Sequence, residues 1–368
     1  MKSLNPPFLR RDQELDELKI LQTAISDGVL VVDDQLTPIF FNSKLRLLFP
    51  MSDMGPNLNE TLSFIHNLEV VNGFREVMET GKAITLHAQK FHFSDGGRIY
   101  LSVSLSPLKV GSNARGVIGI FHDVTELKTA EQMRIDFVAN VSHELRTPLT
   151  SIQGYVETLL EDAESGRKVE TSYLKVVQRN TQRLLTLIDD LLDLSTLESN
   201  PAALHKEKLD THAISERVMV NLSHKSQLKK QHISVNSIEG PQVFADPRRL
   251  EQVLTNLLDN AIKFTPNEGK IKIDWFENLE SPGVFLKISD TGPGITAKHH
   301  ARLFERFFRV DKARSRDMGG TGLGLAIVKH IMQSHQGTVE VESTPGEGTT
   351  FICAFPHPKN IKFLGDRL

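Results

Sequence analysis

The sequence predicts a multidomain protein of the α+β class. The chain has 368 residues, which is more than a single domain of roughly 150 residues usually contains. Short β-rich runs fill its first third, a long stretch of helical period follows, and strand-like and helix-like segments alternate in its last part. We therefore expect three folded units of different architecture.

Composition excludes several other classes of protein. Hydrophobic residues make up 39% of the chain and charged residues 24%, which is typical of globular domains and excludes collagen-like, wholly disordered and polytopic membrane chains. The 43 Lys and Arg nearly balance 46 Asp and Glu, so we expect no nucleic-acid partner. The single cysteine, Cys353, excludes an intramolecular disulfide and suits a reducing cytosol. No apolar run resembles a membrane span or a secretory signal, which favours a cytoplasmic protein.

The first 125 residues predict a helical linker and a small mixed domain. Residues 8–23 are charged, with leucines at helical spacing, and predict a linker helix within residues 1–23. Residues 24–125 predict an α+β domain with a helix-like stretch between Leu58 and Thr80. Its expected strands are 28–34, 37–42, 83–93, 98–108 and 114–124.

Residues 126–200 have a helical period and predict two long helices joined by a turn at Glu164-Ser165-Gly166. Seven apolar residues of the first helix share an arc of roughly 80° that we expect to be buried. They are Val138, Val141, Leu145, Leu149, Ile152, Val156 and Leu159. His143 points about 160° away from this arc, so we expect it to be exposed, with Glu144 beside it, Thr147 one turn on, and Pro148 weakening the helix beyond.

A solvent-facing imidazole can act as a nucleophile toward a phosphoryl group when its second nitrogen is held and its proton can leave. Glu144 could orient the ring or take that proton, and Thr147 could hold a water molecule. The periodicity alone equally allows a plain solvated helix face that carries a histidine.

Residues 205–357 predict a mixed α/β domain with a polar helix face. Asp246 and Pro247 are typical of a helix start, and Pro266 ends the helix. Leu250, Val253, Leu254, Leu257, Ala261 and Phe264 are expected to face a core. Asn256, Asn260 and Lys263 form a polar stripe within roughly 60° of each other, which suits Mg²⁺ and phosphate oxygens or, alternatively, is an ordinary exposed face.

Two glycine-rich segments follow that helix. Asp290-Thr291-Gly292-Pro293-Gly294 ends an apolar strand and would bring a carboxylate to a cavity, where it could accept a hydrogen bond from the amine of adenine. The run from Gly319 to Gly324 leads into a helix, whose free N–H groups suit a polyphosphate. Between them, residues 304–320 are aromatic and cationic, and read either as a mobile lid over phosphate or as a basic surface loop.

Together, these segments resemble the sensor histidine kinases of two-component systems. SHELRTPL (142–149) resembles the family's H box, NLLDNAIKF (256–264) its N box, DTGPGI (290–295) its G1 box, FERFFR (304–309) its F box and GGTGLGLAIVK (319–329) its G2 box. Within the family, the stretch around His143 is most like the phosphate-regulon sensor kinases. Those normally carry membrane spans, so the chain is either a soluble member or the cytoplasmic portion of an inner-membrane sensor.

The resemblance implies a fold for each unit. Residues 24–125 would form a PAS-like sensor domain, which ends at the typical junction Asp123-Val124-Thr125. Residues 126–200 would be a dimerisation and histidine-phosphotransfer hairpin, and residues 205–357 a Bergerat-type ATP-binding domain, followed by a tail at 358–368.

The resemblance also implies ATP and Mg²⁺ as cofactors and a role for each motif residue. His143 would accept the phosphoryl group, Glu144 would act as base, and Thr147 would position water for dephosphorylation of a response regulator. Asn256 and Asn260 would hold Mg²⁺, Lys263 would contact phosphate, and Asp290 would read adenine. The other expected nucleotide-site residues are Phe264, Gly292, Gly294, Ile295, Arg309, Gly320, Thr321, Gly322, Leu323 and Gly324.

Partners and signal are less constrained by the sequence. The apolar seam of the second helix comprises Leu174, Val177, Leu184, Leu185, Ile188, Leu191 and Leu192. Both seams exceed what two helices can bury, which predicts a homodimer built on a four-helix bundle. The sensed signal stays open between a small metabolite, no ligand, and haem held by His66, His87 or His92. A scaffold that only binds ATP and a serine-directed kinase or ATPase are the alternatives to a histidine kinase.

Overall fold

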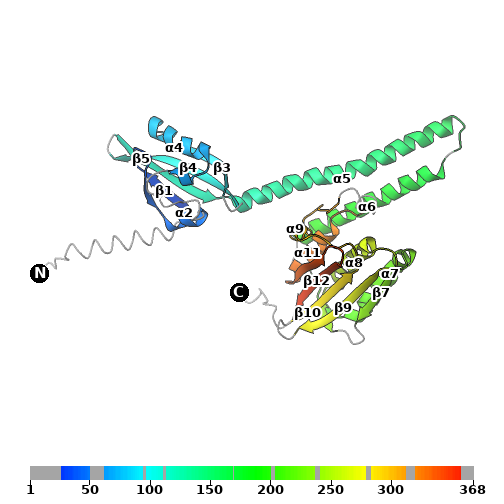
Figure 1. Cartoon of the computed structure of the whole chain (residues 1–368). Coiled ribbons are helices and arrows are strands. Elements are labelled where there is room, and N and C mark those ends of the chain that lie inside the picture. Colours follow the sequence, from blue (N-terminus) through cyan, green and yellow to red (C-terminus); the bar gives the residue numbers. More distant parts are fainter. Residues whose placement is uncertain are drawn as a thin grey trace. The chain divides into compact units, whose positions relative to one another are not determined.

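The computed structural model divides the chain into two compact units, residues 1–136 and 137–368. It describes residues 26–49, 62–93, 97–110, 113–168, 170–199, 204–236, 241–278, 283–311 and 320–357. The expected linker helix at 8–23 and the tail at 358–368 lie outside these ranges. Figure 1 labels the helices and strands of both units.

The first unit is built on an antiparallel sheet of order β2-β1-β5-β4-β3. Its strands are β1 (Gly28–Val32), β2 (Pro38–Phe41), β3 (Ile84–His92), β4 (Arg98–Val110) and β5 (Asn113–Asp123), which confirms the five predicted strands. Helix α2 (Ser43–Leu48), the 3-10 turn η1 (Leu62–Phe64) and helix α4 (Leu68–Thr80) complete the described part. The α2 helix has no apolar period long enough to be predicted from the sequence.

Aromatic rings fill the core of this unit. The ring of Phe49 makes edge-to-face contacts with Phe64, Phe91, Phe93 and Phe121 at centroid distances of 5.5 to 6.0 Å. Such pairs stabilise a core beyond their buried area. At the far end of β5, the backbone N–H of Tyr100 donates to the hydroxyl of Thr125, which ties the first residue of the next helix to the sheet.

Two long helices follow, α5 (Thr125–Glu164) and α6 (Thr171–Ser199), with the turn at Gly166 where the sequence predicts it. Helix α5 passes through the buried Pro148, so the expected weakening does not end it. The prediction that the whole apolar arc of α5 is buried is wrong for a single chain, because Val138, Leu149 and Val156 are exposed. Two helices have too few neighbours to cover it.

The last part of the second unit is a two-layer α/β sandwich (Figure 1). Its sheet has the order β11-β12-β10-β9-β7, with only β7 and β9 parallel. The strands are β7 (His232–Asn236), β9 (Lys270–Asn278), β10 (Gly283–Asp290), β11 (Thr338–Thr344) and β12 (Gly348–Pro356). Strands β6 (Glu207–Asp210) and β8 (Gln242–Ala245) pair antiparallel and form a separate two-stranded sheet.

Three long helices cover one face of this sheet: α7 (Thr211–Leu228), α8 (Pro247–Phe264) and α11 (Gly324–Ser334). Alternating residues of the strands, such as Ile273, Leu286 and Cys353, are buried beneath them. Helix α8 begins as predicted, with the side chain of Asp246 accepting the N–H of Arg249 and with Pro247 in its first turn. A fourth helix, α9 (Ala297–His300), is short.

Two side chains satisfy the last carbonyls of α8. The ammonium of Lys229 donates to the carbonyls of Ile262, Lys263 and Thr265 at 2.7 to 3.2 Å. The amide of Gln231 donates to the carbonyls of Ile262 and Thr265 at 3.0 and 2.8 Å. A cation at a helix C-terminus is also favoured by the helix dipole. The end of α8 is therefore fixed against the turn between α7 and β7.

The buried ring of His335 joins α11 to the start of α8. Its Nε2 accepts the backbone N–H of Asp246 at 3.0 Å, and its Nδ1–H donates to the carbonyl of Ile331 at 2.8 Å. Burial lowers the pKa of His335 below its ordinary value of 6.5. The folded protein thus holds this imidazole neutral, while the unfolded chain binds a proton near pH 6.5.

We expect the free energy of unfolding to be fully maintained above pH 6.5 and to fall as the pH drops below that value, since the unfolded state then binds a proton that folded His335 does not. His335→Gln retains one donor and one acceptor but cannot titrate. Urea unfolding between pH 7.5 and 5 should give a flatter pH profile for this variant. Parallel profiles for the two proteins would contradict the assignment.

Candidate active site

His143 lies on α5 with its side chain exposed, as the helical period predicts. The hydroxyl of Thr147, one turn further, is also exposed and donates to the carbonyl of His143 at 3.2 Å. The imidazole is therefore open to a group that approaches from outside the helix, and Thr147 lies on the same side of α5.

The carboxylate of Glu144, next to His143, lies between two arginines. Its Oε2 accepts a hydrogen bond from Arg183 of α6 at 2.9 Å and one from Arg309 at 3.1 Å. Arg309 also donates to the carbonyl of Gly320 at 2.6 Å, and its side chain is only 7% exposed. Hydrogen bonds between oppositely charged side chains are strong when, as here, both side chains are mostly shielded from solvent. Arg309 thereby connects the neighbour of His143 to the glycine-rich loop.

Three acidic residues of α6 make further contacts with the sandwich. Asp190 accepts the hydroxyl of Thr321 at 2.7 Å, and Asp193 accepts the amide of Gln252 at 2.9 Å. Glu198 pairs with Arg306 and lies 3.4 Å from His330. Burial raises the pKa of Asp190, and the hydrogen bond from Thr321 partly offsets this effect. The acidic side of α6 is thus an internal interface.

Arg183, Asp190 and Asp193 were not predicted as part of the site. They occupy positions of α6 outside its apolar seam, where charged residues are ordinary on an exposed face. The recurrence of Asp189, Asp190 and Asp193 within one turn of the amphipathic helix was the available signal.

Helix α8 presents a polar side that includes Asn256, Asn260 and Lys263, all partly buried. The Nδ2 of Asn256 is buried with no hydrogen-bond partner among the described residues, and its Oδ1 lies against Gly324 at the start of α11. An orphaned amide beside a helix N-terminus fits a phosphate oxygen or a metal-bound water molecule. Lys263 pairs with Asp259 at 2.6 Å.

Phe264 does not face the core, contrary to the sequence-based expectation, because it is 43% exposed. It is the last residue of α8, directly before the C-cap residue Thr265. Its carbonyl lies close to Gly292, where a Cβ atom would approach it to 3.3 Å. Phe264 therefore contributes its backbone to the wall that faces the DTGPGI segment.

Asp290 ends β10 and is half-buried. Burial raises the pKa of its carboxyl, while hydrogen bonds from the backbone of Gly292 and Thr349 act in the opposite direction. The N–H of Gly292 donates to Oδ1 of Asp290 at 2.7 Å.

Gly294 adopts a φ of +69°, and a Cβ there would lie 2.0 Å from the carbonyl oxygen of Thr344. The N–H of Ile295 donates to Ser343 at 2.8 Å.

The second glycine-rich loop runs from Gly320 to the start of α11. Gly322 has a φ of +78°, and its carbonyl accepts the N–H of Phe307 at 2.9 Å. The N-cap residue Leu323 is buried and makes no side-chain capping bond, so the first N–H groups of α11 are not satisfied by a cap. Such a helix start attracts anions. The rest of the predicted lid, residues 312–319, lies outside the described residues.

The structure brings the expected residues together in two groups. One group joins His143, Glu144, Arg309 and the loop at Gly320 through the contacts above. The other places Asn256 beside Gly324, and Gly292 beside the carbonyl of Phe264. Asn260 and Lys263 follow on α8 at successive turns between these two contacts.

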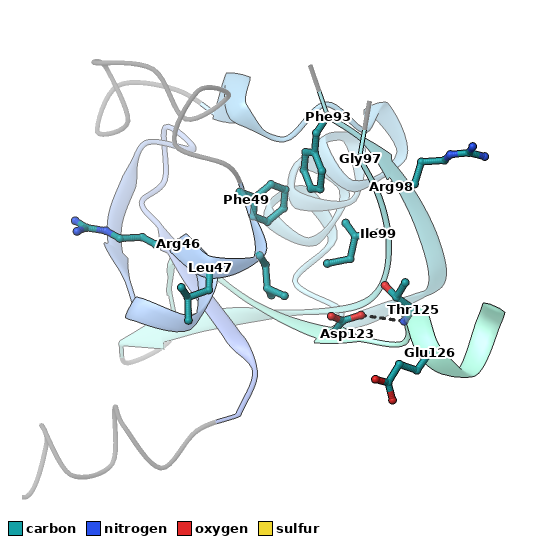
Figure 2. A pocket seen from close by; sticks show the side chains of 11 residues that line it. Arg46, Leu47, Phe49, Phe93, Gly97, Arg98, Ile99, Asp123, Thr125 and Glu126 are labelled. Atoms are coloured by element: carbon teal, nitrogen blue, oxygen red, sulfur yellow. Dashed lines mark hydrogen bonds between the residues drawn. The ribbon is translucent and has the colours of Figure 1, made fainter. Parts of the chain in front are cut away.

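A cavity of about 560 Å³ lies in the first unit, beside the start of α5. Figure 2 shows Phe49, Phe93 and Ile99 around it, whereas Arg46 and Arg98 extend away. The guanidinium of Arg46 stacks on Phe41 instead. None of the described residues that line this cavity is a histidine or cysteine.

The structure does not support haem binding by His66, His87 or His92. All three side chains are exposed, and none of them lines the cavity of the first unit. The Phe-rich core occupies the space beneath the sheet. Of the three alternatives that the sequence leaves open for the signal, this arrangement does not favour a haem held by one of these histidines.

Gly294→Ala should weaken nucleotide binding about tenfold or more, because the new Cβ would collide with the carbonyl of Thr344 and the left-handed conformation costs about 1–2 kcal/mol. Gly154→Ala is the matched control, since this residue of α5 belongs to neither glycine-rich loop and a Cβ there meets nothing within 4 Å. Titration with a fluorescent ATP analogue measures both affinities, and circular dichroism checks folding. Equal affinities for the two variants would contradict the proposed loop geometry.

Comparison with known proteins agrees with the motifs. A model described as "Histidine kinase-, DNA gyrase B-, and HSP90-like ATPase" matches residues 245–359, one described as "His Kinase A (phospho-acceptor) domain" matches residues 133–200, and one described as "PAS fold" matches residues 23–129. The three matches follow the order that the sequence motifs predict. Among the described residues, no helix has an apolar stretch long enough to cross a membrane.

Individual relatives are sensor kinases. The phosphate regulon sensor protein PhoR of Pseudomonas aeruginosa is 41% identical over 64% of this chain and 53% of its own length. The sensor protein kinase WalK of Staphylococcus epidermidis is 38% identical over 94% of this chain and 56% of its own length. The chain thus spans about half the length of these relatives.

One solved structure shares the fold over most of the chain. The histidine kinase ThkA, crystallised in complex with the response regulator protein TrrA, matches with a TM-score of 0.50 and 24% identity, covering 93% of this chain and 99% of that one. With the phospho-acceptor and ATPase domains matched in order behind a PAS fold, the chain belongs to the PAS-containing sensor histidine kinases of two-component systems.

Proposed function

We propose that the chain is an ATP-dependent protein-histidine autokinase that phosphorylates His143 and passes the phosphoryl group to an aspartate of a separate response regulator. The observation that carries the proposal is the exposed ring of His143 beside Glu144, whose carboxylate is bonded through Arg309 to the glycine-rich loop. This contact brings a phosphate-binding element and a nucleophile into one network.

In the proposed reaction, one imidazole nitrogen of His143 attacks the γ-phosphorus of ATP. A P–N bond forms, the bond from phosphorus to the bridging oxygen breaks, and ADP leaves with that oxygen. The proton on the opposite ring nitrogen passes to Glu144. Arg183 and Arg309 both donate to Oε2 of Glu144, so we assign the proton to its second oxygen, Oε1.

The chain's own residues have distinct proposed roles in nucleotide binding. Asp290 accepts a hydrogen bond from the adenine amine, and the glycines of both loops allow close approach of the backbone. The side-chain carbonyl oxygens of Asn256 and Asn260 would hold Mg²⁺, and Lys263 would contact phosphate after exchanging its partner Asp259. When bound, Mg²⁺ neutralises charge on the triphosphate.

The exposed apolar side chains of the hairpin support a homodimer. Leu149 and Val156 of α5 and Leu185, Ile188 and Leu192 of α6 are exposed in the single chain. Large apolar side chains exposed in such number on one hairpin usually mark an interface. A second copy would cover it in a four-helix bundle, in which two hairpins contribute the same face.

We place the kinase reaction in the cytoplasm, where ATP and receiver domains are available, and we infer that the PAS-like unit controls it. The Thr125 contact with Tyr100 supports this control, because it couples the sheet of that unit to the first residue of α5. The match with a phosphate regulon sensor supports a role in phosphate regulation.

His143→Gln should bind ATP with the affinity of the wild type yet take up no phosphoryl group, because the variant removes only the exposed nucleophile. Incubation with radiolabelled Mg·ATP, followed by acid treatment, distinguishes phosphohistidine, which acid cleaves, from phosphoserine. Asn260→Asp changes the nucleotide site and leaves His143 in place, so this control variant should lose nucleotide binding and labelling together. Labelling that persists in His143→Gln would reject the site, and an unlabelled wild type that binds ATP would indicate a scaffold.

Thr147→Ala should reduce removal of phosphate from the regulator more than it reduces autophosphorylation. Its hydroxyl is exposed one turn from His143 and donates to the carbonyl of His143 on the same helix, so its loss leaves the nucleotide site intact. Both rates can be measured on one preparation with a phosphorylated receiver domain. An equal loss of both activities would contradict this role.

A further inference from the structure

The DTGPGI segment is held by the hairpin of β11 and β12 as well as by its own strand. The carbonyl of Pro293 accepts the N–H of Gly346 at 2.8 Å, and the N–H of Ile295 donates to the hydroxyl of Ser343 at 2.8 Å. Gly294 lies so close to the carbonyl of Thr344 that no side chain fits between them. Three consecutive residues of the segment thus contact one turn of the sheet.

Ser343 has every hydrogen-bonding position of its hydroxyl in use. The hydroxyl donates to the carbonyl of Gly348 at 2.8 Å and accepts the N–H of Ile295. The hydroxyl of Thr349 lies 3.0 Å away and completes the set as a second donor. A serine hydroxyl has one donor and two acceptor positions, so this half-buried group is fully satisfied and fixed in direction.

The hydrogen bond between Ser343 and Thr349 also connects Ser343 to the carboxylate of Asp290. Thr349 pairs with Asp290 across β10 and β12, and its backbone is one of the two that hydrogen-bond the carboxyl group. Gly292 supplies the other bond at the beginning of the loop. Ser343 therefore joins the far end of the loop, at Ile295, to the strand residue that supports Asp290.

We propose that Ser343 is a positioning residue for nucleotide binding, which sets the distance between the Asp290 carboxylate and the loop 292–295 by bonding Ile295 and Thr349 together. This inference rests on the proposed adenine pocket at Asp290. Without the hydroxyl, the loop keeps its bond at Gly292 and the bond from Gly346 to the carbonyl of Pro293, but it loses its bond at Ile295. The base pocket widens, while His143 and the phosphate-binding loop at Gly320 are untouched.

Ser343→Ala should raise the KM for ATP and the dissociation constant of a fluorescent ATP analogue about fivefold to tenfold, because one part-buried hydrogen bond is lost. The kcat for autophosphorylation should stay within about twofold of the wild type, since the transferred group and His143 are elsewhere. Ser343→Thr keeps the hydroxyl and should restore most of the affinity.

Thr350→Ala is the matched control. It removes another half-buried hydroxyl bond between β12 and β10, from Thr350 to Ser289 at 2.9 Å, which does not touch the loop. Thermal unfolding shows whether the two variants lose similar stability. A KM that rises in Ser343→Ala and stays normal in Thr350→Ala supports positioning. An unchanged KM in Ser343→Ala, or an equal rise in both variants, overturns the proposal.

Asp290→Asn separates this inference from the proposed function. If it weakens ATP binding while Ser343→Ala does not, only the role of Ser343 fails. If Asp290→Asn leaves ATP affinity unchanged, the pocket assignment fails and the role of Ser343 fails with it.

Discussion

The carboxylate of Glu144 is shared by Arg183 and Arg309, and this arrangement determines how the second unit is organised around His143. Arg183 comes from the same hairpin, whereas Arg309 comes from the sandwich that carries the glycine-rich loops. All three side chains are at most 21% exposed. A partly buried carboxylate without a cationic partner destabilises the folded state. If Glu144 loses its bond to one arginine, the bond to the other arginine therefore becomes more important for stability. The contact can therefore form and break without leaving Glu144 alone.

Each of the neighbouring contacts reinforces this docking. Asp190 holds Thr321 of the loop that precedes α11, and Arg306 both pairs with Glu198 and stacks over the ring of Phe137 at 5.2 Å. Thr321 and Arg309, two of the residues proposed to surround a triphosphate, thus also contact the hairpin. If nucleotide binds there as proposed, its binding and the docking of the sandwich act on these two side chains and are thermodynamically coupled.

Much of this organisation follows from the sequence. The helical period predicts that His143 is exposed, and Asp246 with Pro247 predicts the start of α8, because both depend on local geometry alone. The prediction for Phe264 is wrong, because the helical period does not show that the last residue of α8 is exposed. Arg183, Asp190 and Ser343 are functional only through partners 39 to 131 residues away, and one sequence does not give such pairings. The motif residues can be recognised from the sequence, because the order and spacing of their glycines and asparagines do not depend on knowing tertiary contacts.

The central claim is that the exposed imidazole of His143 receives the phosphoryl group. Mass spectrometry of the wild-type chain after brief incubation with Mg·ATP, with digestion at alkaline pH to preserve a P–N bond, locates that group directly. The account predicts one phosphoryl group on His143 that disappears after acid treatment. A phosphoryl group that survives acid on Ser142 or Thr147, or on any residue other than His143, would contradict it.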